Sequence, residues 1–205
     1  MLREGDQAAL DGTLVRMEKN FRRLDHLIQN IIVLTRNRLM EEENQPIRVQ
    51  DIVAETLETL SHLEDFPRIR IENHVDQELT IVNKLSRFQI IVGNMISNAI
   101  KYHDRQEAEP RIDIHAMRRA GRVRLSVEDN GIGIPPESRA HLFRMFKRLH
   151  PNRSFGSGLG LYILKRSAES LGGTAFYEPK EKGSRFVIEL PDGDGHEYRS
   201  DPGRR

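Results

Sequence analysis

The sequence predicts a mixed α/β (α+β) fold, a two-layer α/β sandwich of helices on a sheet, with a long bundle-forming helix before it. Three observations lead to this prediction. Residues 10–34 carry a 3.5-residue apolar repeat, which is typical of helices packed in bundles. Residues 47–191 mix helical periodicity with strand-like alternation, and three helices with five or six half-buried strands fit two packed layers. Polar residues at 41–46 form a linker between the two regions.

The region before the linker is expected to supply one helix of a bundle. Apolar side chains recur at alternating intervals of four and three from Leu10 to Ile31, and Leu27 and Leu34 widen the stripe beyond a two-stranded seam. An amphipathic helix lying on its own globular domain is the alternative, which the polar linker argues against. A monomer would have to cover this stripe, so we expect a homodimer through residues 10–35.

The elements of the second region follow from local patterns. Amphipathic segments predict three helices, at residues 51–63, 84–102 and 158–171. Alternating apolar residues predict strands at residues 68–71, 79–82, 111–116, 123–127, 174–177 and 185–190. Gly172 and Gly173 would cap the last helix. The polar, glycine-rich tail at residues 192–205 is expected to be disordered.

Composition excludes several classes of function. Lys and Arg number 32 against 31 Asp and Glu, and the net charge of +1 gives no global field that would attract nucleic acid or an anionic membrane. The absence of cysteine excludes disulfides and thiolate metal sites. No apolar run approaches the roughly 20 residues that span a bilayer, and the N-terminus is too polar for a secretory signal. We therefore expect a soluble, cytoplasmic chain with no nucleic-acid partner and no membrane segment.

The long helix predicted at residues 84–102 carries polar side chains along one edge. At about 100° per residue, Asn98 lies about 40° from Asn94, and Lys101 lies about 20° to the other side. The carbonyl oxygen of an Asn can ligate Mg²⁺ without adding charge, and a Lys ammonium can neutralise a phosphate oxygen. The alternative is that all three side chains are solvated surface residues.

An acidic residue stands at the end of a strand that reads as buried. Asp129 follows the strand predicted at residues 123–127, and its carboxylate could accept a hydrogen bond from an exocyclic amine. Gly131 and Gly133 would let the backbone approach a flat ring closely. An ordinary turn is the alternative, because Asp-Asn-Gly is common in turns.

Three glycines precede the last predicted helix. Gly156, Gly158 and Gly160 would expose backbone N–H groups and the positive end of the helix dipole, which suits phosphate. The spacing fits neither the dinucleotide fingerprint nor the P-loop, so both readings are disfavoured. The glycines could also form a hinge, and the basic segment at residues 147–155 is placed to act as a lid over an anion.

A further short motif, Phe143-Arg-Met-Phe146, stands between Asp129 and the three glycines. The four motifs fall in a fixed order, at residues 94–101, 129–134, 143–146 and 156–161. In that order and separation they resemble the N, G1, F and G2 boxes of the histidine-kinase-type ATPases. Their wording is most similar to that of bacterial sensor histidine kinases. The resemblance implies an ATP-binding catalytic domain at residues 47–191.

The resemblance extends to the N-terminal region. Residues 13–38 are similar to the second helix of the kinase dimerisation domain, which implies a partial dimerisation domain at residues 1–40. Kinases of this family phosphorylate a histidine in the preceding helix, and no histidine here has the expected sequence context, His26 included. We therefore expect no autophosphorylation by this chain alone.

The resemblance also implies ATP and Mg²⁺ as cofactors. Asn98 would ligate Mg²⁺ and Asn94 would support the metal–phosphate site. Lys101 would meet a phosphate, Asp129 would bind the adenine amino group, and Arg148 is a candidate contact to the γ-phosphate. The other residues that the resemblance places around the nucleotide are Tyr102, Gly131, Gly133, Ile134, Phe146, Gly156, Ser157, Gly158, Leu159, Gly160 and Leu161.

The function implied by the resemblance is transfer of the γ-phosphoryl group of ATP to a histidine that is absent from this chain. Partners would be the acceptor helix of the same kinase and the receiver domain of a response regulator. Two alternatives stay open. One is an ATP-gated scaffold that transfers nothing, and the other is a protein-serine kinase of the anti-sigma type.

Overall fold

The computed structural model describes residues 13–14, 17, 42–147 and 158–193. The bundle helix expected from residue 10 to residue 35 lies outside the described residues except for three positions. Arg148, Gly156, Ser157 and the tail from residue 194 also lie outside them, so these predictions stay predictions. None of the helices in the described part of the chain combines the length and the apolar composition of a membrane-spanning segment.

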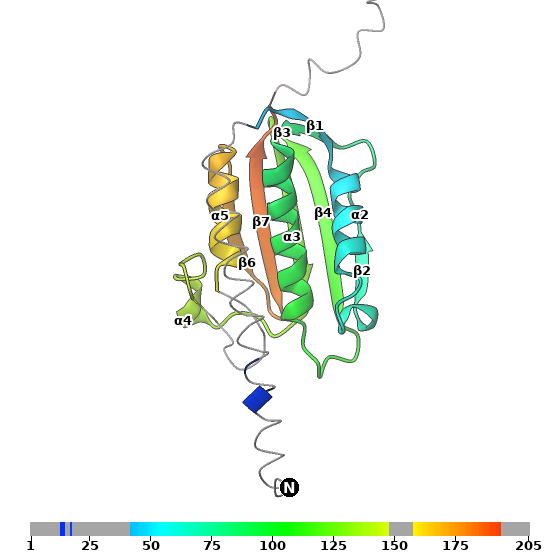
Figure 1. Ribbon diagram of the computed structural model, residues 1–205, viewed down its shortest axis with the longest axis vertical. Coiled ribbons are helices and arrows are strands. Elements are labelled where there is room, and N and C mark those ends of the chain that lie inside the picture. Colours follow the sequence, from blue (N-terminus) through cyan, green and yellow to red (C-terminus); the bar gives the residue numbers. More distant parts are fainter. Residues whose placement is uncertain (1–12, 15–16, 18–41, 148–157, 194–205) are drawn as a thin grey trace, which may run out of the picture.

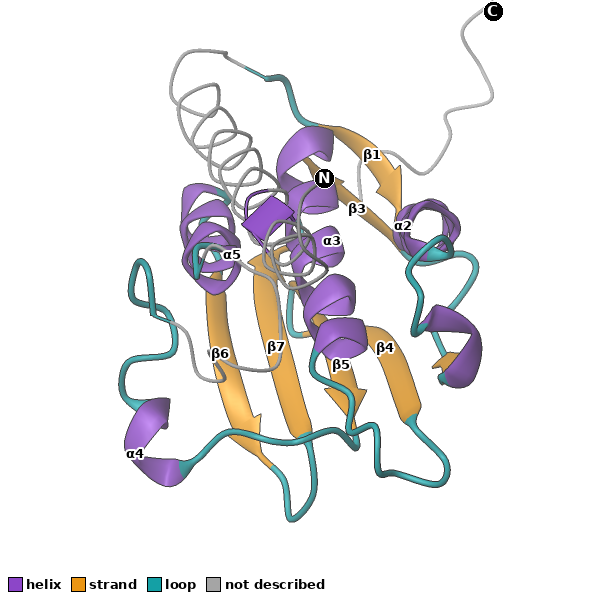
Figure 2. Cartoon of the chain, turned by 60° about the horizontal axis from the view of Figure 1, so that its bottom comes forward, coloured by secondary structure: helices purple, strands orange, loops and turns teal. Residues whose placement is uncertain are grey.

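Three helices cover one face of a five-stranded sheet (Figures 1 and 2), so the expected two-layer α/β sandwich is confirmed. The helices are α2 (Val49–Leu60), α3 (Leu85–Lys101) and α5 (Gly160–Ser170). In spatial order the strands are β2 (Arg70–Asn73), β4 (Arg111–Arg119), β5 (Arg122–Asp129), β7 (Ser184–Pro191) and β6 (Thr174–Pro179).

The sheet combines two kinds of strand pairing. β4, β5, β7 and β6 pair antiparallel, whereas the edge strand β2 joins β4 in parallel. The β4–β5 hairpin turns at Ala120 and Gly121, both with positive φ, a two-residue turn that matches the right-handed twist of the strands. Register follows the side-chain alternation, because slipping one residue would move every apolar side chain to the opposite face.

A second, two-stranded sheet was only half predicted. The strand expected at residues 79–82 is β3 (Thr80–Asn83), but it pairs antiparallel with β1 (Gln45–Arg48), which was not predicted. The last two residues of the expected linker, Gln45 and Pro46, therefore begin a strand. The polar flanks of Ile47 hid β1, because one buried residue in four gives no alternation to detect.

Most predicted boundaries agree with the structure to within two or three residues. The helix expected at residues 84–102 runs from Leu85 to Lys101. The strand expected at residues 68–71 starts two residues later, because Phe66–Arg68 form a 3₁₀ turn with Pro67 in its first turn. The short helix α4 (Pro136–Arg139) was not predicted.

The core lies between the helices and the sheet, and α3 is at its centre. α3 is flanked by α2 and α5 and lies over the middle of the sheet (Figure 1). It buries more of its length than either neighbour, through Phe88, Ile91, Val92, Met95, Ile96, Ala99 and Ile100. A fully buried large apolar side chain contributes roughly 1.5–3 kcal/mol, so this face of α3 holds the two layers together.

The alternation in β5 divides the sheet into two faces. Val123, Leu125 and Val127 are buried beneath the helices, and Arg124 and Glu128 point to the face that none of the described helices covers. We call these the helix face and the outer face of the sheet.

Candidate functional site

Two carboxamides lie where α3 meets α5. Nδ2 of Asn94 donates to the backbone oxygen of Ile90 at 2.8 Å, which fixes the orientation of the amide. A Cβ atom built on Gly160 would lie 2.8 Å from Oδ1 of Asn94 and 3.9 Å from Oδ1 of Asn98. Both amide oxygens therefore lie beside the first turn of α5, as the predicted clustering of Asn94, Asn98 and Gly160 requires.

Asn98 carries an unsatisfied donor. Its Nδ2 is buried and has no hydrogen-bond partner among the described residues. A buried donor without a partner costs about 1–3 kcal/mol, and such groups in a native fold call for an explanation. An acceptor on a bound ligand would satisfy it.

The C-terminal end of α3 brings in two more of the predicted residues. Lys101 is exposed on the surface, yet the protein around it desolvates its ammonium group and lowers its pKa. The backbone of Tyr102 caps the helix, since its N–H donates to the oxygen of Asn98 at 2.9 Å. The oxygen of Tyr102 accepts from the N–H of Ile132 at 3.1 Å, so this end of α3 is joined to the loop after β5.

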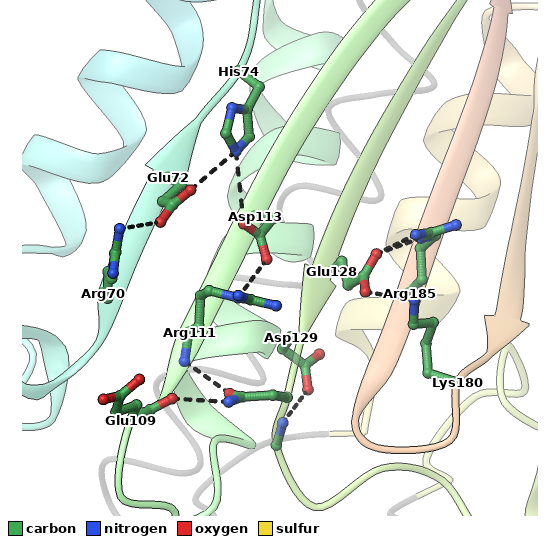
Figure 3. Close-up of polar contacts among 12 residues, drawn as sticks. Arg70, Glu72, His74, Glu109, Arg111, Asp113, Glu128, Asp129, Lys180 and Arg185 are labelled. Atoms are coloured by element: carbon green, nitrogen blue, oxygen red, sulfur yellow. Dashed lines mark hydrogen bonds and ion pairs between the residues drawn. The ribbon is translucent and has the colours of Figure 1, made fainter.

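Asp129 is the last residue of β5 and points to the helix face, with only 6% of its surface exposed. Its Oδ1 accepts the N–H of Gly131 at 2.9 Å (Figure 3), and the carboxylate also accepts the N–H of Ser184. Burial raises the pKa of Asp129 to about 7; the two N–H donors act in the opposite direction, and the neighbouring charge of Glu128 adds to the rise. A carboxylate this desolvated favours a ligand that brings its own donor.

Ser184 was not predicted as part of this site. It is 5% exposed, and it lies directly opposite Asp129 in the β5–β7 ladder. The only sequence signal was a Gly-Ser pair at the start of a strand, which says nothing about the partner strand. Its role became visible only through the pairing register.

The glycines around Asp129 lie in close contact with other segments of the protein's own backbone. A Cβ on Gly131 would lie 2.3 Å from the oxygen of Tyr102, and one on Gly183 would lie 1.8 Å from the oxygen of Asp129. Gly133 and Gly183 both have positive φ. The loop after β5 is thus held between α3 and the β6–β7 hairpin, which positions the Asp129 carboxylate from both sides.

Asn130 anchors the same loop to the start of β4. Its Oδ1 accepts the N–H of Arg111 at 2.7 Å, and its Nδ2 donates to the oxygen of Glu109 at 2.8 Å (Figure 3). The Asp-Asn-Gly segment therefore forms a turn that is stabilised by the side chain of Asn130, as its sequence predicts. The turn is compatible with the burial of the Asp129 carboxylate, because the side chains of Asp129 and Asn130 point in different directions.

The remaining described residues of the predicted set fall into two groups. The side chains of Ile134 and Leu159 are buried, and we expect them to support the residues of the site from the core rather than to form its surface. Phe146 is exposed, and a Cβ on Gly158 would lie 2.9 Å from its carbonyl carbon, so the third and fourth motifs meet there. Leu161 is half-buried against the core.

A separate open cavity of about 500 Å³ lies on the outer face, where Asp129 and Asn130 form part of the wall and Arg111, Lys180 and Lys182 supply cations. It does not contain the carboxamides of α3. The chemically distinctive groups are instead on the helix face: a buried carboxylate at one end, two carboxamides and a helix N-terminus at the other, and an ammonium nearby. That set suits a ligand with an amine donor at one end and an anion with its cation at the other.

Comparison with known proteins identifies relatives of this arrangement. The family model described as histidine kinase-, DNA gyrase B-, and HSP90-like ATPase matches residues 83–194. Sensor histidine kinase RppB of Synechocystis sp. is 30% identical over 188 residues, which are 85% of this chain and 39% of that protein. Sensor-like histidine kinase SenX3 of Mycobacterium tuberculosis is 30% identical over 177 residues, which are 82% of this chain and 42% of that protein. The chain thus spans about two fifths of each relative's length.

Solved structures give the same result. The mycobacterial sensor histidine kinase MprB is 26% identical with a TM-score of 0.62, over 72% of this chain and 97% of that one. Full-length ShkA in complex with AMPPNP is 25% identical with a TM-score of 0.69, over 93% of this chain and 40% of that one. The catalytic domain of histidine kinase ThkA, at 24% identity and a TM-score of 0.64, supports the fold.

Proposed function

This chain belongs to the histidine kinase-, DNA gyrase B- and HSP90-like ATPases, and from that premise we propose that it binds Mg-ATP as the catalytic domain of a two-component sensor histidine kinase. The observation that carries the proposal is the buried carboxylate of Asp129. It is the most strongly perturbed acid among the described residues, and it lies in the second of the four motifs. ATP binding follows from the family, and the roles of individual residues are part of the proposal.

Asp129 is proposed to accept the exocyclic amine of adenine. One of its oxygens is held by the N–H of Gly131, and the carboxylate is desolvated on the helix face. In such surroundings a hydrogen bond to a charged acceptor is worth more than in water. The same surroundings leave an unpartnered carboxylate costly, so the site favours bases with an amino group at this position.

The carboxamides of α3 are proposed to hold the metal and phosphates. Asn98 would ligate Mg²⁺ through Oδ1, and its unpartnered Nδ2 is free to donate to a ligand oxygen. Asn94 and the first turn of α5 lie beside it, and Lys101 supplies a cation for a phosphate. A bound Mg²⁺ would neutralise charge on the phosphate oxygens and orient them. Arg148, outside the described residues, is retained as the candidate contact to the γ-phosphate.

The whole kinase is proposed to transfer the γ-phosphoryl group to a histidine on an acceptor helix, in the cytoplasm, and from there to a response regulator. Transfer needs an acceptor imidazole placed in line with the phosphoryl group. The nucleotide site described here would supply positioning and charge neutralisation. A homodimer through residues 10–35 would bring an acceptor within reach.

Binding of a fluorescent ATP analogue tests the adenine assignment. We expect Asp129→Ala to weaken binding about 5- to 150-fold, because a buried donor on the ligand loses its acceptor. Glu128→Gln is the matched control, since the adjacent side chain points to the outer face. Its charge is the smallest of the influences on the pKa of Asp129, so affinity should change little. Wild-type affinity in Asp129→Ala would remove Asp129 from the nucleotide site.

The metal assignment is tested by comparing the same titration in Mg²⁺ and in EDTA. We expect Asn98→Ala to lose more affinity in Mg²⁺ than in EDTA, because the amide oxygen is assigned to the metal. Ser97→Ala, the neighbouring half-buried position, should behave as wild type under both conditions. Equal losses for Asn98→Ala in both buffers would make Asn98 a purely structural residue.

Incubation with γ-labelled ATP separates the kinase from its alternatives. With an acceptor-helix protein added, we expect acid-labile, base-stable label on the acceptor and none on the chain alone. Acid-stable label would favour a serine kinase. Tight nucleotide binding with no transfer to any acceptor would favour a scaffold, and label on the chain alone would make His26 the first residue to mutate.

A further inference from the structure

The outer face of the sheet carries a group of metal-ligating side chains at the β2–β4 edge, on the opposite side of the sheet from the helix face. Glu72 of β2 and Asp113 of β4 are direct partners in the parallel ladder. His74 follows β2, and its N–H donates to the oxygen of Ile114 at 2.8 Å, which continues the same hydrogen bonding. The three side chains converge from rigid backbone positions (Figure 3).

The carboxylates of Glu72 and Asp113 each have one oxygen beside an arginine and the other beside His74. Oε1 of Glu72 lies 2.7 Å from Nη2 of Arg70, and Oε2 lies 3.4 Å from Nε2 of His74. Oδ2 of Asp113 lies 2.9 Å from Nε of Arg111, and Oδ1 lies 3.6 Å from the same Nε2 of His74. The arginines thus hold the outer oxygens and leave one oxygen of each acid facing the imidazole.

A second histidine restrains the first. The rings of His74 and His115 are stacked, with centroids 4.5 Å apart and an angle of 9° between their planes. A stacked ring is less free to rotate, so Nε2 of His74 stays directed at the two carboxylates. The side chains of His74, Glu72 and Asp113 are 42%, 31% and 15% exposed, so an ion can reach them from solvent.

We propose that Glu72, His74 and Asp113 form a binding site for a divalent transition-metal ion of the Zn²⁺ or Ni²⁺ type. The three donor atoms lie within 4.8 Å of one another. Tetrahedral coordination at bond lengths of about 2.0–2.1 Å separates ligand atoms by roughly 3.3 Å. The 3.4 Å and 3.6 Å separations from Nε2 are close to that value, so only small side-chain movements are needed.

The ligand types decide which ions fit. One imidazole with two carboxylates suits Zn²⁺ and Ni²⁺, whereas Mg²⁺ and Ca²⁺ prefer oxygen ligands alone. Arg70 and Arg111 act from the second layer, where they orient the carboxylates, as outer partners commonly do in metal sites. Their two positive charges offset the two carboxylates, so affinity is expected to be moderate, and three protein ligands leave a coordination position for water.

A bound ion would link the edge strand β2 to β4 through side chains, in addition to the backbone hydrogen bonds between the two strands. β2 is only four residues long, and among the described strands it pairs with β4 alone. An ion bound to the folded state alone raises the melting temperature, because it shifts the folding equilibrium by mass action. This site is separate from the proposed Mg-ATP site, which uses the helix face of the same sheet.

Isothermal titration with ZnCl₂, without nucleotide, tests the proposal on the full chain. The chain has eight histidines, so the readout is the difference from wild type in stoichiometry and affinity. We expect His74→Gln to lose one bound equivalent and Asp113→Asn to bind that equivalent at least 10-fold more weakly. Glu178→Gln, an arginine-paired acid of β6 at the opposite edge of the sheet, and His62→Gln, an exposed histidine, should match wild type.

Thermal melting and histidine side-chain NMR provide independent readouts. Zn²⁺ should raise the melting temperature of wild type, Glu178→Gln and His62→Gln but not of His74→Gln, and it should shift the Nε2 resonance of His74. Melting curves without metal show whether each variant is folded. If His74→Gln does not fold, Asp113→Asn, which is the more conservative substitution, takes its place as the test variant. Equal Zn²⁺ binding in wild type, His74→Gln and Asp113→Asn would overturn the proposal. So would a His74 ring that responds to pH but not to Zn²⁺, which would leave a histidine held only by ion pairs.

Discussion

The two faces of the central sheet use the same strands for opposite purposes, and neighbouring residues of β5 show the difference most clearly. Asp129 points to the helix face, where burial raises its pKa to about 7. Glu128 points to the outer face, where partial burial also acts to raise its pKa. Hydrogen bonds from Lys180 and Arg185, with their charges, outweigh that effect and hold the pKa of Glu128 below its ordinary value.

The comparison teaches that charge alone does not identify a functional group in this protein. The outer face holds most of the ion pairs between described residues, including Arg124 with Glu178 and Glu189, and these are mutually satisfied. Among the described residues, the helix face holds few charges, and the carboxylate of Asp129 has no cationic partner there. A polar group that burial leaves needing a ligand is a stronger indication of binding than a dense network of paired ions.

The largest expected effect contrasts two adjacent residues of β5. Leu125→Ala should lower the free energy of unfolding by about 2–5 kcal/mol, because it removes a fully buried side chain and leaves a cavity. Arg124→Ala on the outer face should cost about 1 kcal/mol or less. Urea denaturation of both variants is the measurement. Similar losses would show that the outer face contributes to stability as much as the core does.

The pH dependence of stability should have opposite signs at Asp129 and Glu128. The folded state raises the pKa of Asp129 from 3.8 to about 7, so it disfavours the ionised form, and this residue lowers stability as pH rises from about 4 to about 7. Relative to wild type, Asp129→Asn should therefore become more stable over that window, by about 2–4 kcal/mol.

Glu128 provides the control in the same experiment. Its pKa is lowered in the folded state, so it contributes stability above its ordinary value of 4.5 and loses that contribution as pH falls through the folded value. Glu128→Gln should be less stable than wild type at pH 7 and similar to it near pH 3. Urea denaturation from pH 3 to pH 8 measures both variants, and parallel curves for wild type and Asp129→Asn would contradict the burial of an ionised group.

Gly121 and Gly183 have similar backbone conformations but different surroundings. Substituting each by Ala therefore separates the cost of backbone strain from the cost of a steric clash. Gly121 (φ 71°) has nothing within 4 Å of a built Cβ, whereas Gly183 (φ 80°) would place a Cβ 1.8 Å from the oxygen of Asp129. Gly121→Ala should cost about 1 kcal/mol, from the left-handed conformation alone. Gly183→Ala should cost more, about 2–3 kcal/mol, and should weaken nucleotide binding, because it displaces Asp129. Equal effects on stability, with no effect on binding, would mean that the hairpin does not position the site.

The smallest expected effect concerns the ion pairs of the outer face. Arg185 contacts Glu128 and Glu178, and its side chain is 34% exposed. Arg185→Met should change the free energy of unfolding by only about 0–1 kcal/mol, and the difference from wild type should shrink in 1 M NaCl because salt screens such pairs. A larger, salt-insensitive loss would show that the outer face behaves as a second core.

Much of the fold was predictable because its signals are local. The 3.6-residue periodicity of α3 and the alternation in β5 and β7 depend on neighbouring residues, and all three elements lie where the sequence predicts them. The edge that joins Asn94 and Asn98 was also predictable, since both are on one helix. β1 was missed because only one of its four residues is buried, and the parallel pairing of β2 with β4 has no sequence signature.

The sequence by itself determined which residues are helical, which face of each element is apolar and which motifs carry polar chemistry, because those properties repeat over a few residues. Tertiary structure alone decided that Ser184 donates to Asp129, that burial raises the pKa of this acid to about 7, and that Glu72, His74 and Asp113 converge on the outer face. These properties depend on strand register and on desolvation. Both arise only when segments far apart in the chain pack together, and so no local pattern could encode them.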